Sequence, residues 1–198
     1  MNLSSRMVIV LTGVGIIAGA FLASVGIYTK EQIALNKQKE IEKAIAIVVP
    51  GTHSSEKIYE EKDLSVFIDR DEEGKLIGYA ILASGVGFQD KITLMYGTNP
   101  EITKITSLTI LEQKETPGLG AKITDKDSFL VFWENRDCTS PLSLRSPPAA
   151  SPEELSPSEV NTITGATISS ESVLHIVSDS LEKLKLLKGE GKLESISE

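Results

Sequence analysis

The chain has 198 residues, of which 40% are hydrophobic and 24% are charged, and its formal net charge is −8 at pH 7. This composition fits one domain of ordinary size with a membrane anchor and excludes a disordered chain. The negative charge argues against binding to nucleic acid and against adhesion to anionic lipid. The single cysteine, Cys138, cannot form an intrachain disulfide or ligate an iron–sulfur cluster, and two histidines are too few for a histidine-rich metal site. We therefore expect no metal site.

The N-terminal segment has the composition of a membrane anchor. Residues 7–28 contain no charged side chain and are long enough to cross a bilayer as a helix, so we predict a transmembrane anchor over residues 1–29. A signal peptide cleaved near Ala23 is the alternative, but the apolar run is longer than a usual signal core. Arg6 favours a cytoplasmic N-terminus, which predicts a single-pass protein of the cell (inner) membrane with its domain on the extracytoplasmic side.

The rest of the chain predicts an α+β domain. Residues 30–51 predict an amphipathic linker helix that Pro50-Gly51 ends, and residues 52–62 predict a polar loop. We expect residues 52–190 to form one domain with an antiparallel sheet and a C-terminal helix, followed by a polar tail over residues 191–198. The predicted strands are residues 64–69, 75–83, 92–96 and 102–111, with a hairpin turn at 71–74. No long helix alternates with these strands, which excludes a doubly wound nucleotide fold.

Two further segments separate the sheet from the last helix. Residues 128–135 predict a helical turn packed on the sheet, in which Trp133 either stacks on a ligand or fills the core. Residues 136–157 are rich in proline and serine and predict a long surface excursion.

The stretch from residue 161 to residue 170, Asn-Thr-Ile-Thr-Gly-Ala-Thr-Ile-Ser-Ser, precedes an apolar pattern with helical spacing. It therefore lies at a helix N-terminus, where Ser169 or Thr167 is predicted to cap the first turn, while Gly165 allows a tight backbone turn. A helix start with free N–H groups is a favourable seat for a phosphate. A capped junction without any ligand is the alternative.

Residues 164–170 resemble the flavinylation motif of the FMN-binding domain family, and Glu115-Thr-Pro-Gly-Leu-Gly120 resembles a second signature of that family. The resemblance implies covalent FMN, whose phosphate a separate flavin transferase esterifies to the hydroxyl of Thr167. Residues 78–80 and 84–88 also match the family's sheet pattern and are expected to converge on the flavin pocket. The remaining implied cofactor-binding residues are Thr164, Gly165, Ala166, Ser169, Glu115, Thr116, Gly118, Leu119 and Gly120.

One position departs from the family pattern. The family often has Asp where this chain has Asn161. In the family this position is expected to help the transferase recognise its target.

The sequence contains no glycine-rich dinucleotide fingerprint after a strand and no catalytic constellation of its own. The resemblance is closest to the G subunits of Rnf-type complexes and extends to the C subunits of sodium-pumping NADH:quinone reductases. It implies an electron-transfer subunit of an ion-translocating ferredoxin:NAD oxidoreductase, which takes part in the enzyme without a complete catalytic site. The implied partners are other membrane subunits and the flavin transferase. Two alternatives remain: a stand-alone membrane-anchored flavin carrier for an extracellular reductase, and a non-redox anchored binding domain.

Overall fold

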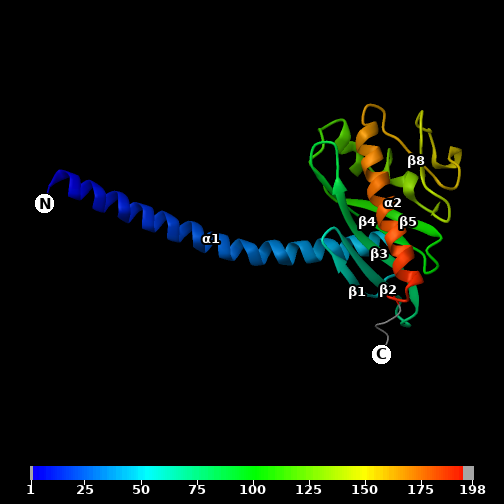
Figure 1. Cartoon of the computed structure of the whole chain (residues 1–198), viewed down its shortest axis with the longest axis horizontal. Coiled ribbons are helices and arrows are strands. Elements are labelled where there is room, and N and C mark those ends of the chain that lie inside the picture. Colours follow the sequence, from blue (N-terminus) through cyan, green and yellow to red (C-terminus); the bar gives the residue numbers. More distant parts are fainter. Residues whose placement is uncertain (1, 194–198) are drawn as a thin grey trace. The chain divides into compact units, whose positions relative to one another are not determined.

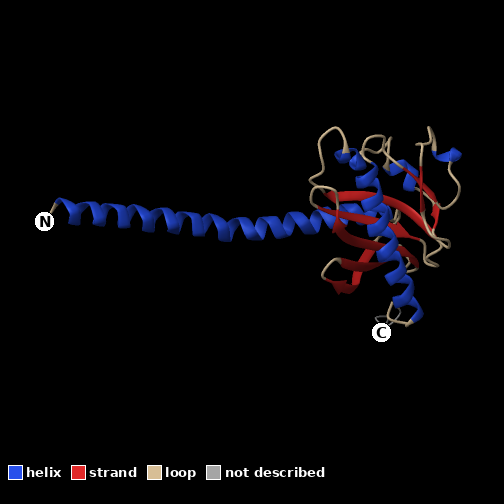
Figure 2. Cartoon of the chain, turned by 45° about the horizontal axis from the view of Figure 1, so that its top comes forward, coloured by secondary structure: helices blue, strands red, loops and turns tan. Residues whose placement is uncertain are grey.

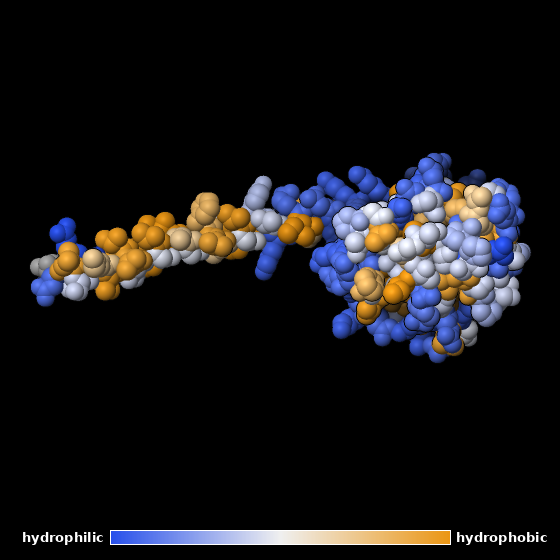
Figure 3. All heavy atoms as spheres, turned by 90° about the horizontal axis from the view of Figure 1, so that it is seen from above, coloured by the Kyte–Doolittle hydropathy of each residue, from blue (hydrophilic) through white to orange (hydrophobic). Residues whose placement is uncertain are grey.

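The computed structural model describes residues 2–193 and divides the chain after Glu42 into two units. Helix α1 (Leu3–Val48) runs without interruption through the predicted boundary between anchor and linker at residue 30 (Figure 1). By length and composition it can cross a membrane, since its most apolar window has a mean hydropathy of 2.4 and none of that window is buried. Apolar side chains are exposed along this helix (Figure 3). α1 is thus a candidate membrane anchor.

The second unit is built on a six-stranded antiparallel sheet in which each strand pairs with the next along the chain (Figure 2). The four predicted strands are confirmed, and two further strands lie at the edges. The strands are β1 (Ser54–Glu61), β2 (Leu64–Arg70), β3 (Leu76–Val86), β4 (Lys91–Thr98), β5 (Lys104–Glu112) and β6 (Arg136–Asp137). The predicted loop over residues 52–62 is wrong, because β1 is an edge strand whose backbone pairs with β2 while most of its side chains stay exposed.

Helix α2 (Thr167–Gly189) packs against one face of this sheet and buries the predicted apolar pattern, including Val173, Val177 and Leu184. The predicted side-chain cap is wrong: Ala166 stands at the N-cap and no side chain caps the helix. Ser169 is buried and bonds a distant residue instead, and the Ser170 hydroxyl accepts from the Ile163 amide and donates to the Ala166 carbonyl, both at 3.1 Å.

The opposite face of the sheet is covered by the last turns of α1, which belong to the second unit. Ala44, Ile45, Val48 and Val49 are buried there. The Thr106 hydroxyl donates a hydrogen bond to the Val48 carbonyl, which fastens the end of the helix to β5. The compact unit therefore begins at Lys43 and differs from the predicted domain start at residue 52.

A buried carboxylate lies on this second face. Asp69 in β2 is fully buried, and among the described residues no donor has hydrogen-bond geometry to either of its oxygens. Gly78 lies directly opposite in β3, where a Cβ would overlap the Thr98 carbonyl oxygen and lie 3.2 Å from the Val49 side chain. Burial raises the pKa of Asp69 to about 6, and the nearby Ser55 hydroxyl and Ala80 amide offset only part of that effect.

The connection from β5 to α2 contains three short 3-10 helices and one strand pair. The predicted helical turn is confirmed, and Trp133 fills the core, fully buried and edge-on to Phe129 at 6.1 Å between ring centres. The predicted surface excursion is partly tied down, because Arg136 and Cys138 are buried at its start. The elements are η1 (Gly120–Thr124), η2 (Leu130–Trp133), η3 (Pro152–Glu154), and the parallel strands β7 (Ser143–Arg145) and β8 (Glu159–Asn161).

Candidate functional site

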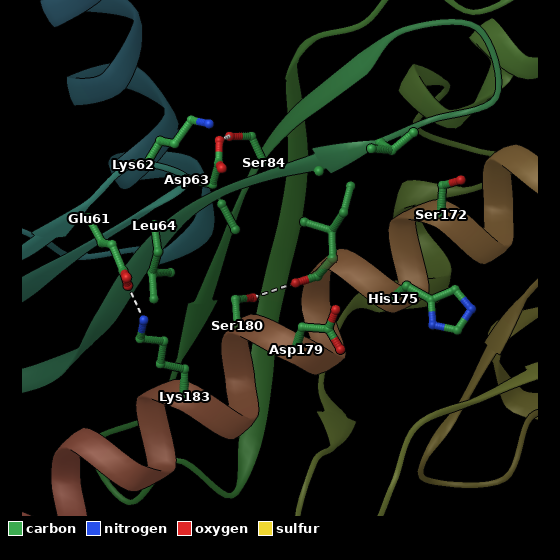
Figure 4. Close-up of a pocket in the computed structure, with 14 residues that line it drawn as sticks. Glu61, Lys62, Asp63, Leu64, Ser84, Ser172, His175, Asp179, Ser180 and Lys183 are labelled. Carbon is green, nitrogen blue, oxygen red and sulfur yellow. Dashed lines mark hydrogen bonds and ion pairs between the residues drawn. The ribbon is translucent and has the colours of Figure 1, made fainter.

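A cavity of about 600 Å³ lies along the flank of α2 beside the β1–β2 turn and the end of β3 (Figure 4). Its charged side chains are mostly paired: Lys183 forms an ion pair with Glu61, and Lys91 holds Asp63 at 2.6 Å. None of the ten predicted cofactor residues lines this cavity. The candidate site is therefore a second, smaller cavity.

The smaller cavity has a volume of about 330 Å³ and is formed by three segments that are far apart in sequence. These are the hairpin tip between β3 and β4, the loop that follows β5, and the junction before α2. Eight of the ten predicted residues line it, whereas Thr164 and Gly118 are exposed outside the lining. The lining residues are Phe88, Glu115, Thr116, Leu119, Gly120, Gly165, Ala166, Thr167, Ile168 and Ser169.

Glu115 fastens the three segments to one another. The Glu115 side chain is 4% exposed. Its Oε1 accepts hydrogen bonds from the amides of Phe88 at 2.8 Å and Gln89 at 3.1 Å, both in the hairpin tip. Its Oε2 accepts from the Ser169 hydroxyl at 2.6 Å, in the first turn of α2. A single carboxylate thus sets the spacing of the cavity walls.

Thr167 is the first residue of α2 and is exposed at the edge of the cavity. Gly165, two residues earlier, has a φ of +81°, which only glycine adopts without strain, and this turn brings the chain into the helix. No side chain caps the first N–H groups of α2. The hydroxyl of Thr167 therefore lies at the positive end of a 23-residue helix.

Apolar side chains surround the mouth of the cavity. Phe88, Ile168 and Leu119 line it and are 59%, 54% and 48% exposed. Val86, at the end of β3, is 85% exposed but lines the larger cavity. Large apolar groups left open to water on a folded domain are characteristic of a ligand or partner site.

Two lining residues were missing from the sequence-based set. Ile168 follows Thr167 directly, and Phe88 belongs to the segment 84–88 that was expected to approach the pocket. Residues 78–80 do not line this cavity; Gly78 instead lies under Val49 on the opposite face of the sheet.

Asn161 is buried and faces the preceding loop. Its amide oxygen accepts from the Ala149 amide at 2.8 Å, and its amide nitrogen donates to the Ala149 carbonyl at 3.0 Å. Both bonds hold the loop around Pro147–Ala149 against β8. In this fold the Asn161 side chain is therefore closed to solvent.

Comparison with known proteins finds a family match over the cavity. Residues 87–182 match the family model of the FMN-binding domain. This range contains every residue that lines the smaller cavity.

Two curated relatives align with nearly the whole chain. One is the G subunit of the ion-translocating oxidoreductase complex of Methanosarcina acetivorans, 24% identical over 192 residues that cover 93% of this chain and 96% of the relative. The other is the G subunit of the proton-translocating ferredoxin:NAD(+) oxidoreductase complex of Clostridium ljungdahlii, 26% identical over 174 residues that cover 87% of each.

Two solved structures have partial similarity to the chain. NqrC of Shewanella oneidensis has a TM-score of 0.49 at 19% identity, over 71% of this chain and 73% of that one. The C subunit of the Na(+)-translocating NADH-quinone reductase of Parabacteroides distasonis has a TM-score of 0.43 at 20% identity, over 68% and 64%.

Proposed function

We propose that this protein is an electron-transfer subunit of an ion-translocating ferredoxin:NAD oxidoreductase of the Rnf type, and that it carries FMN covalently on Thr167. The observation that carries the proposal is the meeting of two signatures, residues 115–120 and 164–170, about 50 residues apart in sequence, around one cavity with Thr167 at its edge. The relatives aligned with nearly the full chain are both G subunits of such complexes.

The chemistry of the cavity suits a flavin nucleotide. The uncapped start of α2 can stabilise the negative charge of a phosphodiester on Thr167 by about 0.3–1 kcal/mol. Phe88, Leu119 and Ile168 offer apolar surface to a flat ring. A Cβ on Gly120 would lie within 3 Å of Ser169 and Glu115, so the glycine keeps this wall compact. A bound flavin supplies the ability to accept and donate electrons.

The residues of this chain would bind, orient and hold the cofactor, and the partner subunits would supply the rest of the reaction. Thr167 would form the phosphoester through its hydroxyl, which prevents loss of the cofactor. The exposed mouth of the cavity would leave the ring open to an electron partner. The protein is thus a non-autonomous subunit of an oxidoreductase.

The proposed setting is the cell membrane. α1 would anchor the protein as a single pass among the other membrane subunits. Arg6 on the N-terminal flank favours an FMN domain on the extracytoplasmic side. A flavin transferase would mature the protein there.

The test is flavinylation of Thr167. Thr167→Val removes the hydroxyl while keeping the shape of the side chain, and Thr164→Val is the matched control because Thr164 is exposed in the same motif outside the cavity lining. After co-expression with a flavin transferase, intact-mass measurement should find an FMN adduct on wild-type protein and Thr164→Val but not on Thr167→Val. A wild-type chain without the adduct would refute the proposal.

Purification of the tagged protein from its native membrane separates the alternatives. Co-purification with several membrane subunits supports the complex, whereas a yellow protein isolated alone would favour the stand-alone flavin carrier. A colourless protein after co-expression with the transferase would favour a non-redox binding domain.

A further inference from the structure

Glu115 lines the proposed flavin cavity, but its hydrogen-bonding capacity is directed at the protein. Three donors from two segments, the amides of Phe88 and Gln89 and the hydroxyl of Ser169, bond its two oxygens. A carboxylate has about four acceptor sites, so at most one remains for a ligand. Glu115 is therefore poorly suited to bind the cofactor directly.

Two glycines beside Glu115 leave the space that its carboxylate occupies. At Gly87 a Cβ would overlap Glu115 Oε1, and at Gly120 a Cβ would lie 2.8 Å from Glu115 Oε2. Both glycines are thus needed for the carboxylate to enter between the hairpin tip and the start of α2. The carboxylate is bonded to the backbone of one apolar lining residue and to the neighbour of another: the Phe88 amide bonds it, and Ile168 precedes Ser169, whose hydroxyl bonds it.

We propose that Glu115 is a positioning residue, which fixes the distance between the hairpin tip and the first turn of α2 and places a fixed negative charge beside the flavin. This inference rests on the proposed function, because it assigns a role to a residue of the same cavity. All three donors point toward Glu115, and its side chain is nearly closed to water, so solvent screens its charge only weakly.

Two consequences can be separated by the choice of variant. Reduction adds negative charge to the flavin, and a neighbouring carboxylate opposes that change, so the reduction potential is held low. Glu115→Gln keeps an oxygen for the two amides and offers its amide nitrogen to the Ser169 hydroxyl, which then accepts. This variant removes the charge and leaves the connection in place. Glu115→Ala removes both.

The control is Glu112→Gln. Glu112 is the last residue of β5, is exposed and does not line the cavity, so this variant makes the same change in net charge three residues away. The full-length, flavinylated protein is titrated spectroelectrochemically in detergent. We expect a more positive flavin potential in Glu115→Gln than in wild type, and no shift in Glu112→Gln.

The effect of Glu115 on the connection between the hairpin tip and α2 is measured without the cofactor, on the full-length Thr167→Val chain. Adding Glu115→Ala should speed amide hydrogen exchange at Phe88 and Gln89 by about tenfold, as expected when a charged hydrogen bond of about 1.5 kcal/mol is lost. Adding Glu115→Gln should change it much less. A flavinylated Glu115→Gln with the wild-type potential, or unchanged exchange in Glu115→Ala, overturns this inference alone. A wild-type protein without FMN overturns both proposals.

Discussion

Replacing Asp69 by Asn should stabilise the domain at alkaline pH. The carboxyl is fully buried in β2, and its pKa in the folded protein is about 6 compared with 3.8 for the ordinary group. Well below pH 3.8 the side chain is protonated in both the folded and the unfolded state, and it has no such effect on stability. Between pH 3.8 and about pH 6 the unfolded chain releases its proton while the folded chain keeps it, so stability falls across this range. Above about pH 6 both states are ionised and the loss is complete.

The difference of about two pKa units corresponds to about 3 kcal/mol at pH 8, at 1.36 kcal/mol per unit. Asn has nearly the same shape and no charge, so Asp69→Asn should regain up to about 3 kcal/mol at pH 8 and only about 0.5 kcal/mol at pH 4. The new amide donors also lack partners in this site, which makes 3 kcal/mol an upper value.

The assay is urea unfolding of the full-length protein in detergent at several pH values between 4 and 8. Asp127→Asn is the matched control, because it makes the same chemical change at an exposed position. If the gain from Asp69→Asn does not increase between pH 4 and pH 8, or if the variant is less stable at pH 8, the reasoning about the buried carboxyl is incorrect.

Two further substitutions test the site. Asn161→Asp should destabilise the protein by about 1–3 kcal/mol at neutral pH, because a buried carboxylate cannot donate to the Ala149 carbonyl. Urea unfolding measures this loss. An unchanged unfolding midpoint would show that the two bonds to Ala149 do not stabilise the fold. Gly120→Ala should reduce the fraction of protein that acquires FMN on co-expression with the transferase, because its Cβ would lie 2.5 Å from Ser169 Oγ. Gly189→Ala, at an open position with an ordinary backbone conformation outside the cavity, serves as the control. Equal flavin fractions in wild type and Gly120→Ala would contradict the need for a bare backbone at that wall.

The strands could be predicted where apolar residues alternate with polar residues along the sequence. Strands β2 to β5 bury one face in the core that they share with α2 and the 3-10 helices, so apolar residues recur along them. β1 was missed because its side chains stay largely exposed and only its backbone is paired, and β6 has only two residues. Neither strand has apolar periodicity that a sequence can reveal.

The sequence predicted which two motifs form the candidate site, but not how their side chains are arranged in it. Ser169 looked like a helix cap because caps are local, yet its hydroxyl bonds Glu115, 54 residues away. Thr164 and Gly118 were included because they belong to the same short motifs, and the fold places them outside the cavity. Burial of Asp69 could not be foreseen, because a carboxylate in a strand is ordinarily exposed to solvent.

The last turns of α1 also determine where the chain can be truncated or cleaved without exposing the core of the domain. A soluble version released by a protease or by truncation must keep residues 43–49, because Val48 and Val49 lie against Gly97 and Gly78 on their face of the sheet. Pro50 follows the end of α1 and is an obvious place to set the domain boundary. Cleavage there would expose the apolar face of the sheet that residues 43–49 cover and leave an aggregation-prone fragment.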